Sequence, residues 1–167
     1  METQSKLSKF FEEEVQDIYW AEKHLIKSLP KMSKAATSQQ LANAFEEHFK
    51  ITEGQIARLE EIFDALGKKP VGKKCEAMDG LIEEAKSIID DTESDTLTRD
   101  CGLIFAAQKI EHYEIASYGS LKAVANILGY QEVAELLDKT LQEEKETDNN
   151  LTKIAESYVN VEAYNEQ

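Results

Sequence analysis

The sequence predicts an all-α protein: a four-helix bundle made of two antiparallel helical hairpins, with a shorter fifth helix. Three observations carry this prediction. Apolar residues recur every three to four positions along four long segments, which is the spacing of one helix face. The 167 residues include only 7 Gly and 2 Pro, so residues that break helices are scarce. No segment shows the alternating apolar pattern of a half-buried strand.

The first hairpin is predicted over residues 5–36 and 38–66, because only a short turn separates these two segments. Pro30 lies inside the first segment, and we expect it to kink that helix or to begin its last turn afresh. Gly67 follows the second segment as a C-terminal stop.

The second hairpin is predicted over residues 96–128 and 131–160, with Gly129 in the turn. The connection between the two hairpins, 67–95, is long and contains a fifth helical pattern at 75–90. Two hairpins joined by one long crossover form a bundle of ferritin-like connectivity. An up-down bundle with short loops throughout fits this pattern less well.

The composition is that of a globular protein, with 41% hydrophobic residues, and we treat 1–167 as one domain. Its 33 acidic residues outnumber 19 basic ones, giving a net charge of −14. Such a surface repels nucleic acid and anionic membranes, so neither is expected as a partner. Cys75 and Cys101 lie in no metal-binding motif, and no stretch reads as a secretion signal or a membrane span. We therefore expect a cytoplasmic protein with reduced thiols.

Polar residues occupy the middle of every apolar stripe, where a core residue is expected. They are Glu22, His48, Thr52, Gln55, Glu111, Glu114, Tyr118, Thr140, Glu144 and Thr147. Glu22 and Thr52 are equally distant from the first turn, and Glu114 and Glu144 are equally distant from the second. Within each hairpin, the polar groups therefore share a level at mid-bundle.

Four glutamates in core phase require compensation, because an unpaired buried carboxylate costs several kcal/mol. No Lys or Arg lies in the central part of any stripe, whereas two divalent cations would balance the four charges. Singly, such residues have simpler explanations: a hydrogen-bonded core histidine, a glutamate that reaches water, or a protonated carboxyl. Together they favour a metal site. The predicted ligands are Glu22, His48, Glu111, Glu114 and Glu144, with Thr52, Gln55 and Tyr118 supporting them. One or two ions of Fe or Mn are expected in preference to Zn.

Several stretches resemble the YciE/YciF family of ferritin-like bacterial stress proteins over nearly the whole chain. They are "DIYWAEKHL" (17–25), "LANAFEEHFKITEGQIARLEEIF" (41–63), "CEAMDGLIEEA" (75–85), "AAQKIEHYEIASYGSL" (106–121) and "TLQEEKETDNNL" (140–151). The resemblance implies a helical homodimer related to rubrerythrin-type domains, a dinuclear metal centre and induction under stress. The five predicted ligands match the family's metal-site positions. The chain departs from the family at Ile51, where a glutamate is common, and it offers one histidine where ferritin-like di-iron sites usually offer two.

Two functions are consistent with these features. The first is a metal-binding protein with ferroxidase, peroxidase or catalase-like chemistry toward a small-molecule substrate that the sequence does not name. The second is a non-enzymatic dimeric stress or scaffold protein whose metal site is incomplete or vestigial. A homodimer is expected in either case, because Phe10, Phe11, Tyr19, Trp20 and Ile26 spread apolar surface over more than one face of the first helix.

Overall fold

The computed structural model describes residues 5–166, and every regular element in that range is helical. The elements are α1 (Lys6–Ala35), α2 (Gln39–Ala65), α3 (Glu76–Asp91), α4 (Leu97–Ile127), α5 (Gln131–Ile154), a π-helical turn (Ala155–Val159) and α6 (Asn160–Asn165). Helices α1 to α4 match the predicted segments 5–36, 38–66, 75–90 and 96–128 to within one residue at each end. The all-α prediction is therefore confirmed.

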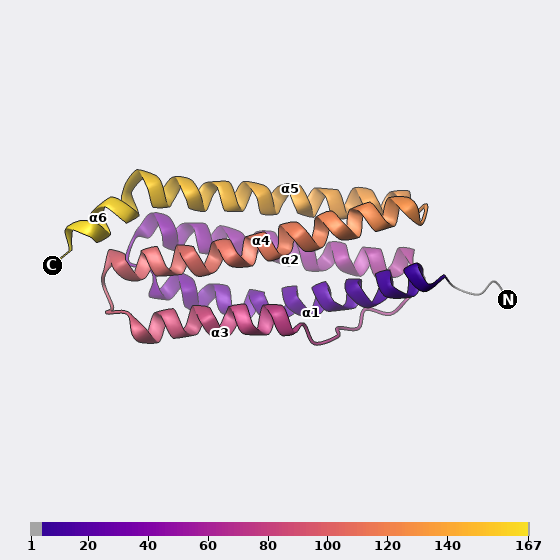
Figure 1. Ribbon diagram of the computed structural model, residues 1–167, viewed down its shortest axis with the longest axis horizontal. Coiled ribbons are helices and arrows are strands. Elements are labelled where there is room, and N and C mark those ends of the chain that lie inside the picture. Colours follow the sequence, from indigo (N-terminus) through magenta and orange to yellow (C-terminus); the bar gives the residue numbers. More distant parts are fainter. Residues whose placement is uncertain (1–4, 167) are drawn as a thin grey trace.

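The long helices form an elongated bundle in which the two hairpin turns lie at opposite ends (Figure 1). Helices α1 and α2 pack as one hairpin and α4 and α5 as the other. The hairpins meet through contacts of α1 with α4 and of α2 with α5. Helix α3 lies outside this ring against α1 and α4, within the long crossover. The predicted connectivity is confirmed.

Local sequence signals explain where the helices begin and end. The side chains of Ser38 and Thr96 accept hydrogen bonds from backbone N–H groups in the first turns of α2 and α4. Gly67 and Gly129 follow α2 and α4 with φ angles of 67° and 77°, a conformation that glycine adopts without strain. Helix α1 continues through the exposed Pro30 to Ala35, so the proline does not end the helix.

The fourth apolar stripe ends differently from the prediction. Residues 131–160 were expected to form one helix with Tyr158 on its buried face. In the structure, α5 ends at Ile154 and a π-helical turn follows, which adds one residue to the turn. The buried position therefore moves to Val159, while Tyr158 is 46% exposed.

Contacts at both ends of the bundle set the height of one hairpin against the other. At one end, the fully buried Asp100 of α4 accepts hydrogen bonds of 2.7 Å from the backbone N–H groups of Thr37 and Ser38, in the α1–α2 turn. At the other end, the hydroxyls of Ser8 and Tyr130 lie 3.1 Å apart. This register brings the polar centres of all four stripes to the same level.

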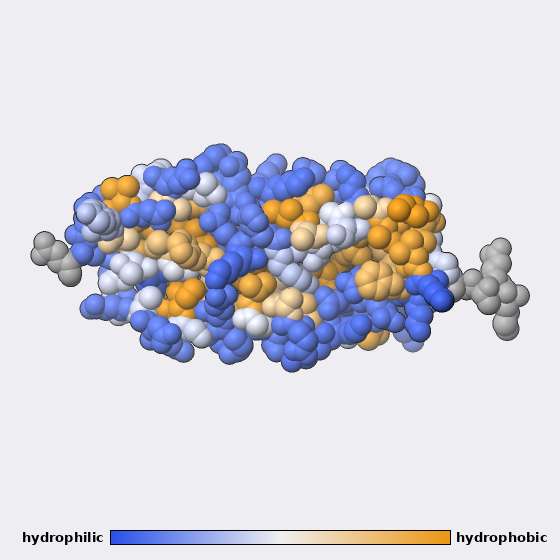
Figure 2. Space-filling model, viewed as in Figure 1, coloured by the Kyte–Doolittle hydropathy of each residue, from blue (hydrophilic) through white to orange (hydrophobic). Residues whose placement is uncertain are grey.

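The surface combines a hydrophilic majority with scattered apolar areas (Figure 2). Part of the apolar surface that suggested a dimer is covered within the chain. Tyr19 packs edge-on against Phe63, and Trp20 packs against Gly72 of the crossover. Phe10 is 54% exposed. No helix between residues 5 and 166 is long and apolar enough to cross a membrane.

Candidate metal centre

Four of the five predicted ligands meet at the centre of the bundle. His48 comes from α2, Glu111 and Glu114 from successive turns of α4, and Glu144 from α5. One ligand atom from each lies within 4.8 Å of the others, and all four side chains are buried. The i, i+3 spacing on α4 places two carboxylates on the same face, as the sequence pattern indicated.

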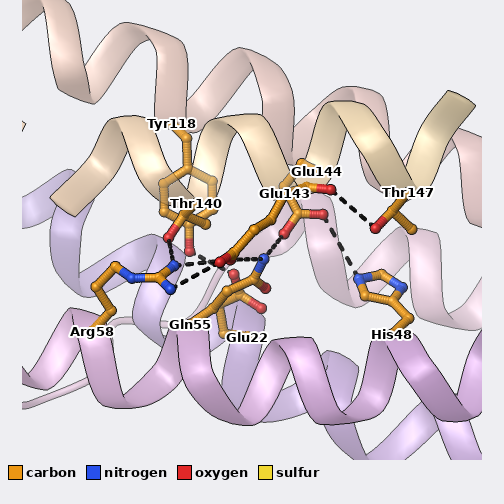
Figure 3. Close-up of polar contacts among 9 residues, drawn as sticks. All are labelled: Glu22, His48, Gln55, Arg58, Tyr118, Thr140, Glu143, Glu144 and Thr147. Carbon is orange, nitrogen blue, oxygen red and sulfur yellow. Dashed lines mark hydrogen bonds and ion pairs between the residues drawn. The ribbon is translucent and has the colours of Figure 1, made fainter. Parts of the chain in front are cut away.

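The imidazole of His48 stands between carboxylates of two different helices. Its Nδ1 atom lies 3.3 Å from Glu111 Oε1, and its Nε2 atom lies 3.7 Å from Glu144 Oε2. Figure 3 shows the ring reaching from α2 toward Glu144 on α5. The Nε2 atom has no hydrogen-bond partner. When the carboxyls are ionised, both oxygens of Glu111, both oxygens of Glu114 and one oxygen of Glu144 also have none, whereas a proton would let Glu111 bond to Glu144 and Glu114 bond to Glu22.

Glu22, the fifth predicted ligand, lies beside this group but is not one of its four members. Its Oε1 atom accepts a hydrogen bond from the Tyr118 hydroxyl, and its Oε2 atom is buried without a partner (Figure 3). The charge of Glu144 raises the pKa of Glu22, and the charge of Glu22 raises the pKa of Glu114. Glu22 and Glu114 also interact through a side-chain hydrogen bond, so Glu22 belongs to the same electrostatic cluster as the four grouped residues. A ligand role for Glu22 remains a prediction.

The predicted supporting residues take three different positions. Gln55 donates a hydrogen bond from Nε2 to Glu144 Oε1 and another, of 3.3 Å, to Glu143 Oε2 (Figure 3). Tyr118 holds Glu22 as described. The Thr52 hydroxyl is buried without a hydrogen-bond partner. Gln55 thus fixes one oxygen of Glu144 and leaves the other free to bind a ligand.

Arg58 is a neighbour of the site that the sequence pattern did not reveal. Its two terminal nitrogens each lie 2.9 Å from an oxygen of Glu143, and Nη1 also donates to Thr140 Oγ1 at 2.6 Å (Figure 3). The sequence held one indication of this pair: Arg58 lies one helical turn after Gln55, and Glu143 lies directly before Glu144. Because Arg58 binds Glu143, its charge does not neutralise the central cluster.

Burial and mutual repulsion make the central carboxyls hard to ionise. Burial raises the pKa of Glu22 from its ordinary 4.5 to about 8, the charge of Glu144 adds to the shift, and the hydrogen bond from Tyr118 opposes it. Burial likewise raises the pKa of Glu111 and Glu114 well above the usual range, again reinforced by Glu144. In a metal-free protein, these groups therefore hold protons that a cation would displace.

The aromatic members of the site stay neutral for the same reason. Burial lowers the pKa of His48, and the charge of Glu144 opposes that shift only in part. Burial, followed by the charges of Glu22 and Glu114, raises the pKa of Tyr118. His48 is thus neutral, as a metal-ligating imidazole must be, and Tyr118 keeps the proton it donates to Glu22.

The donor set fits a divalent cation. Buried polar groups normally have hydrogen-bond partners, so carboxylate oxygens that find none when ionised, together with one unpartnered imidazole nitrogen, favour a bound cation. Carboxylate and imidazole donors suit iron, manganese and zinc. Ile51, half-buried on α2 one turn after His48, contributes only hydrocarbon. The site can therefore hold a cation with the four grouped side chains, and Glu22 could extend it.

Fold and site together define a ferritin-like four-helix protein with a buried carboxylate–histidine cluster that can hold a metal ion. The family described as "Domain of unknown function (DUF892)" matches residues 6–164, and the chain belongs to this family. Protein YciF of Escherichia coli strain K12 is 47% identical over 150 residues, covering 89% of this chain and 90% of that protein.

Solved structures agree with this assignment. The crystal structure of the E. coli stress protein YciF matches with a TM-score of 0.88 and 45% identity, covering 96% of this chain and 99% of that one. YcfI from Rhodopseudomonas palustris matches with a TM-score of 0.87 and 37% identity, covering 90% and 96% of the two chains. The resemblance drawn from the sequence is thereby confirmed.

Proposed function

We propose that this protein binds one or two divalent ions, iron or manganese, at the centre of its helical bundle. His48, Glu111, Glu114 and Glu144 are the ligands, and Glu22 joins them where a second ion binds. The observation that carries the proposal is the convergence of these buried donor atoms, most of which have no hydrogen-bond partner, while the nearby Arg58 is bound to Glu143 and not to the four grouped side chains. The proposal extends to a stress-associated role, because the E. coli relative is described as a stress protein.

The protein's own side chains perform distinct tasks in this proposal. The neutral imidazole of His48 offers Nε2 to the ion, while Gln55 holds Glu144 in place through one oxygen. Tyr118 orients Glu22 from the opposite side of the cluster. Bound iron or manganese would supply redox chemistry toward oxygen or peroxide. The buried position excludes bulk water from the ligands and strengthens their electrostatic attraction to the ion.

Metal analysis after anaerobic loading tests the proposal. Metal-free protein is incubated with Fe(II) or Mn(II), passed through a desalting column and assayed for retained metal. The wild-type protein is expected to retain metal, and Glu114→Gln and Glu144→Gln are expected to lose at least tenfold in affinity, since each removes a charged ligand. Glu53→Gln, which changes an exposed residue on α2, is the control and should match the wild type. A wild-type protein that retains neither metal would refute the proposal.

The alternative function, a non-enzymatic dimeric scaffold with a vestigial site, also has a specific observation in its favour. The cluster satisfies part of its hydrogen bonding internally, through Tyr118 to Glu22 and Gln55 to Glu144, and Ile51 offers no donor. In this case, metal would be absent after loading. Retained metal with no turnover of oxygen or peroxide would instead indicate a binding protein that is not an enzyme.

A further inference from the structure

A small pocket lies between α2 and α5, on the outer side of the metal centre. Its volume is about 90 Å³, and His48, Ile51 and Glu143 are among the residues that line it. Glu47 and Glu146 also line it, and both of their side chains are exposed to solvent. The pocket therefore joins the solvent-exposed surface to a wall of the buried cluster.

His48 belongs to both the pocket and the cluster. The residue is only 3% exposed, yet it lines the pocket, and its unpartnered Nε2 atom lies 3.7 Å from Glu144 Oε2. In Figure 3 the ring lies at the end of the site nearest Thr147, away from Arg58 and Tyr118. A cation that passed from this pocket toward the central carboxylates would therefore pass the His48 ring, whose Nε2 atom faces Glu144.

The charges around the pocket are arranged to attract a cation. Glu47 on α2 and Glu146 on α5 place a carboxylate on each side of the opening, and no lysine or arginine lines it. Glu143 forms part of the wall, but Arg58 binds both of its oxygens. The attraction of the pocket for a cation therefore rests on Glu47 and Glu146.

Ile51 and His48 lie one helical turn apart on α2, and both line the pocket. With a volume of about 90 Å³, the pocket has room for water molecules and for a small cation. The half-buried Ile51 side chain offers no oxygen or nitrogen to replace lost water. Because the cluster is buried, an ion that passes from the pocket into it must lose water, and the Ile51 side chain stands beside that path.

We infer that the α2–α5 pocket is the route by which a divalent cation enters the buried centre. Glu47 and Glu146 attract the ion from solvent, Ile51 restricts its passage, and His48 Nε2 binds it first. This inference rests on the proposed metal-binding function. A restriction on the route changes the rates of uptake and release by the same factor, and it leaves the equilibrium affinity unchanged.

Stopped-flow uptake of Co²⁺ by the metal-free protein tests the route, because ligand-field absorption reports the bound ion directly. Ile51→Ala should raise both the uptake and the release rate constants by about threefold or more, with an unchanged dissociation constant. Glu47→Gln combined with Glu146→Gln should lower the uptake rate constant roughly three- to tenfold at low ionic strength, and added salt should shrink that difference.

The matched control is Asp91→Asn combined with Glu93→Gln, which removes the same charge from two exposed residues at the far end of α3. Its uptake rate should equal that of the wild type. The inference is overturned if the Glu47 and Glu146 variant behaves like this control, or if Ile51→Ala changes affinity without changing both rates together. Absence of equilibrium Co²⁺ binding to the wild-type protein would instead contradict the proposed function.

Discussion

The central carboxyls form a group whose members oppose one another's ionisation. Glu22, Glu111 and Glu114 all have raised pKa values, with burial as the main cause and Glu144 as a further one. A group whose pKa is higher in the folded than in the unfolded chain binds more protons when folded. Its stabilising contribution is complete below the unfolded value of about 4.5 and is lost as the pH rises through the folded value.

The metal-free protein should therefore lose stability as the pH rises from 6.5 to 8. The Glu22 carboxyl alone should lower the free energy of unfolding by about 2 kcal/mol over this interval, at roughly 1.4 kcal/mol per pH unit. The window begins at 6.5 because the lowered pKa of His48 has the opposite effect at lower pH. Urea unfolding followed by circular dichroism, with a chelator present, measures the change.

Two comparisons identify the groups responsible. Glu22→Gln removes one titrating carboxyl, so the decline between pH 6.5 and 8 should be shallower than in the wild type. Mn²⁺ should abolish most of the decline in the wild type, because the ion binds the deprotonated carboxylates. Equal slopes for the wild type and Glu22→Gln would show that Glu22 ionises normally.

At the scale of the elements, α3 lies so close to α4 that one glycine is needed between them. A Cβ atom at Gly102 would lie 2.7 Å from Cγ2 of Ile88, whereas a Cβ atom at Gly119, on the same helix, would meet nothing within 4 Å. Replacement by alanine therefore creates a steric conflict at Gly102 and none at Gly119.

Gly102→Ala should destabilise the protein by about 1–2 kcal/mol, because the added methyl group pushes α3 away from α4. Gly119→Ala should stabilise it by about 0.5–1 kcal/mol, because alanine favours a helix interior. Thermal and urea unfolding measure both changes. In an Ile88→Ala background the steric conflict is removed. There, Gly102→Ala should lower the free energy of unfolding by less than it does in the wild type. A Gly102→Ala variant as stable as Gly119→Ala would mean that the helices separate without cost.

The elements themselves were largely predictable from local sequence. Apolar spacing located α1 to α4, and the stops at Gly67 and Gly129 follow from the need for a positive φ angle. The polar interruptions of the stripes also identified the grouped residues of the site. These features depend on residues within a few helical turns of one another. The periodicity of the sequence shows directly which of these residues share a helix face.

The features missed from the sequence depend on contacts between distant segments. The register of the hairpins is set by Asp100 against the turn at Thr37 and by Ser8 against Tyr130, and no local pattern encodes these pairs. The ion pair of Arg58 with Glu143 likewise appears only once α2 and α5 are docked. The π-helical turn after Ile154 changes the helical phase, which a fixed period of 3.6 residues cannot anticipate.

At the scale of the whole molecule, a cytoplasmic homodimer remains our prediction. The argument from α1 is narrower than the sequence suggested, because Tyr19 and Trp20 are covered by other parts of the chain. Exposed apolar side chains remain, including Phe10 at 54% and Phe105 at 60%. Size-exclusion chromatography with light scattering should give twice the monomer mass of 18.9 kDa at micromolar concentration. A monomer mass under these conditions would contradict the prediction.

The division of the site between the two hairpins has a consequence for the order of folding. The first hairpin supplies Glu22 and His48, and the second supplies Glu111, Glu114 and Glu144. Neither hairpin alone holds the complete set of donors, so the ion binds tightly only after the hairpins have docked. Manganese should therefore slow unfolding while leaving the refolding rate constant unchanged, as rapid dilution experiments in urea would measure. The ion would then bind after the two hairpins have docked, and it would have to dissociate before they could separate.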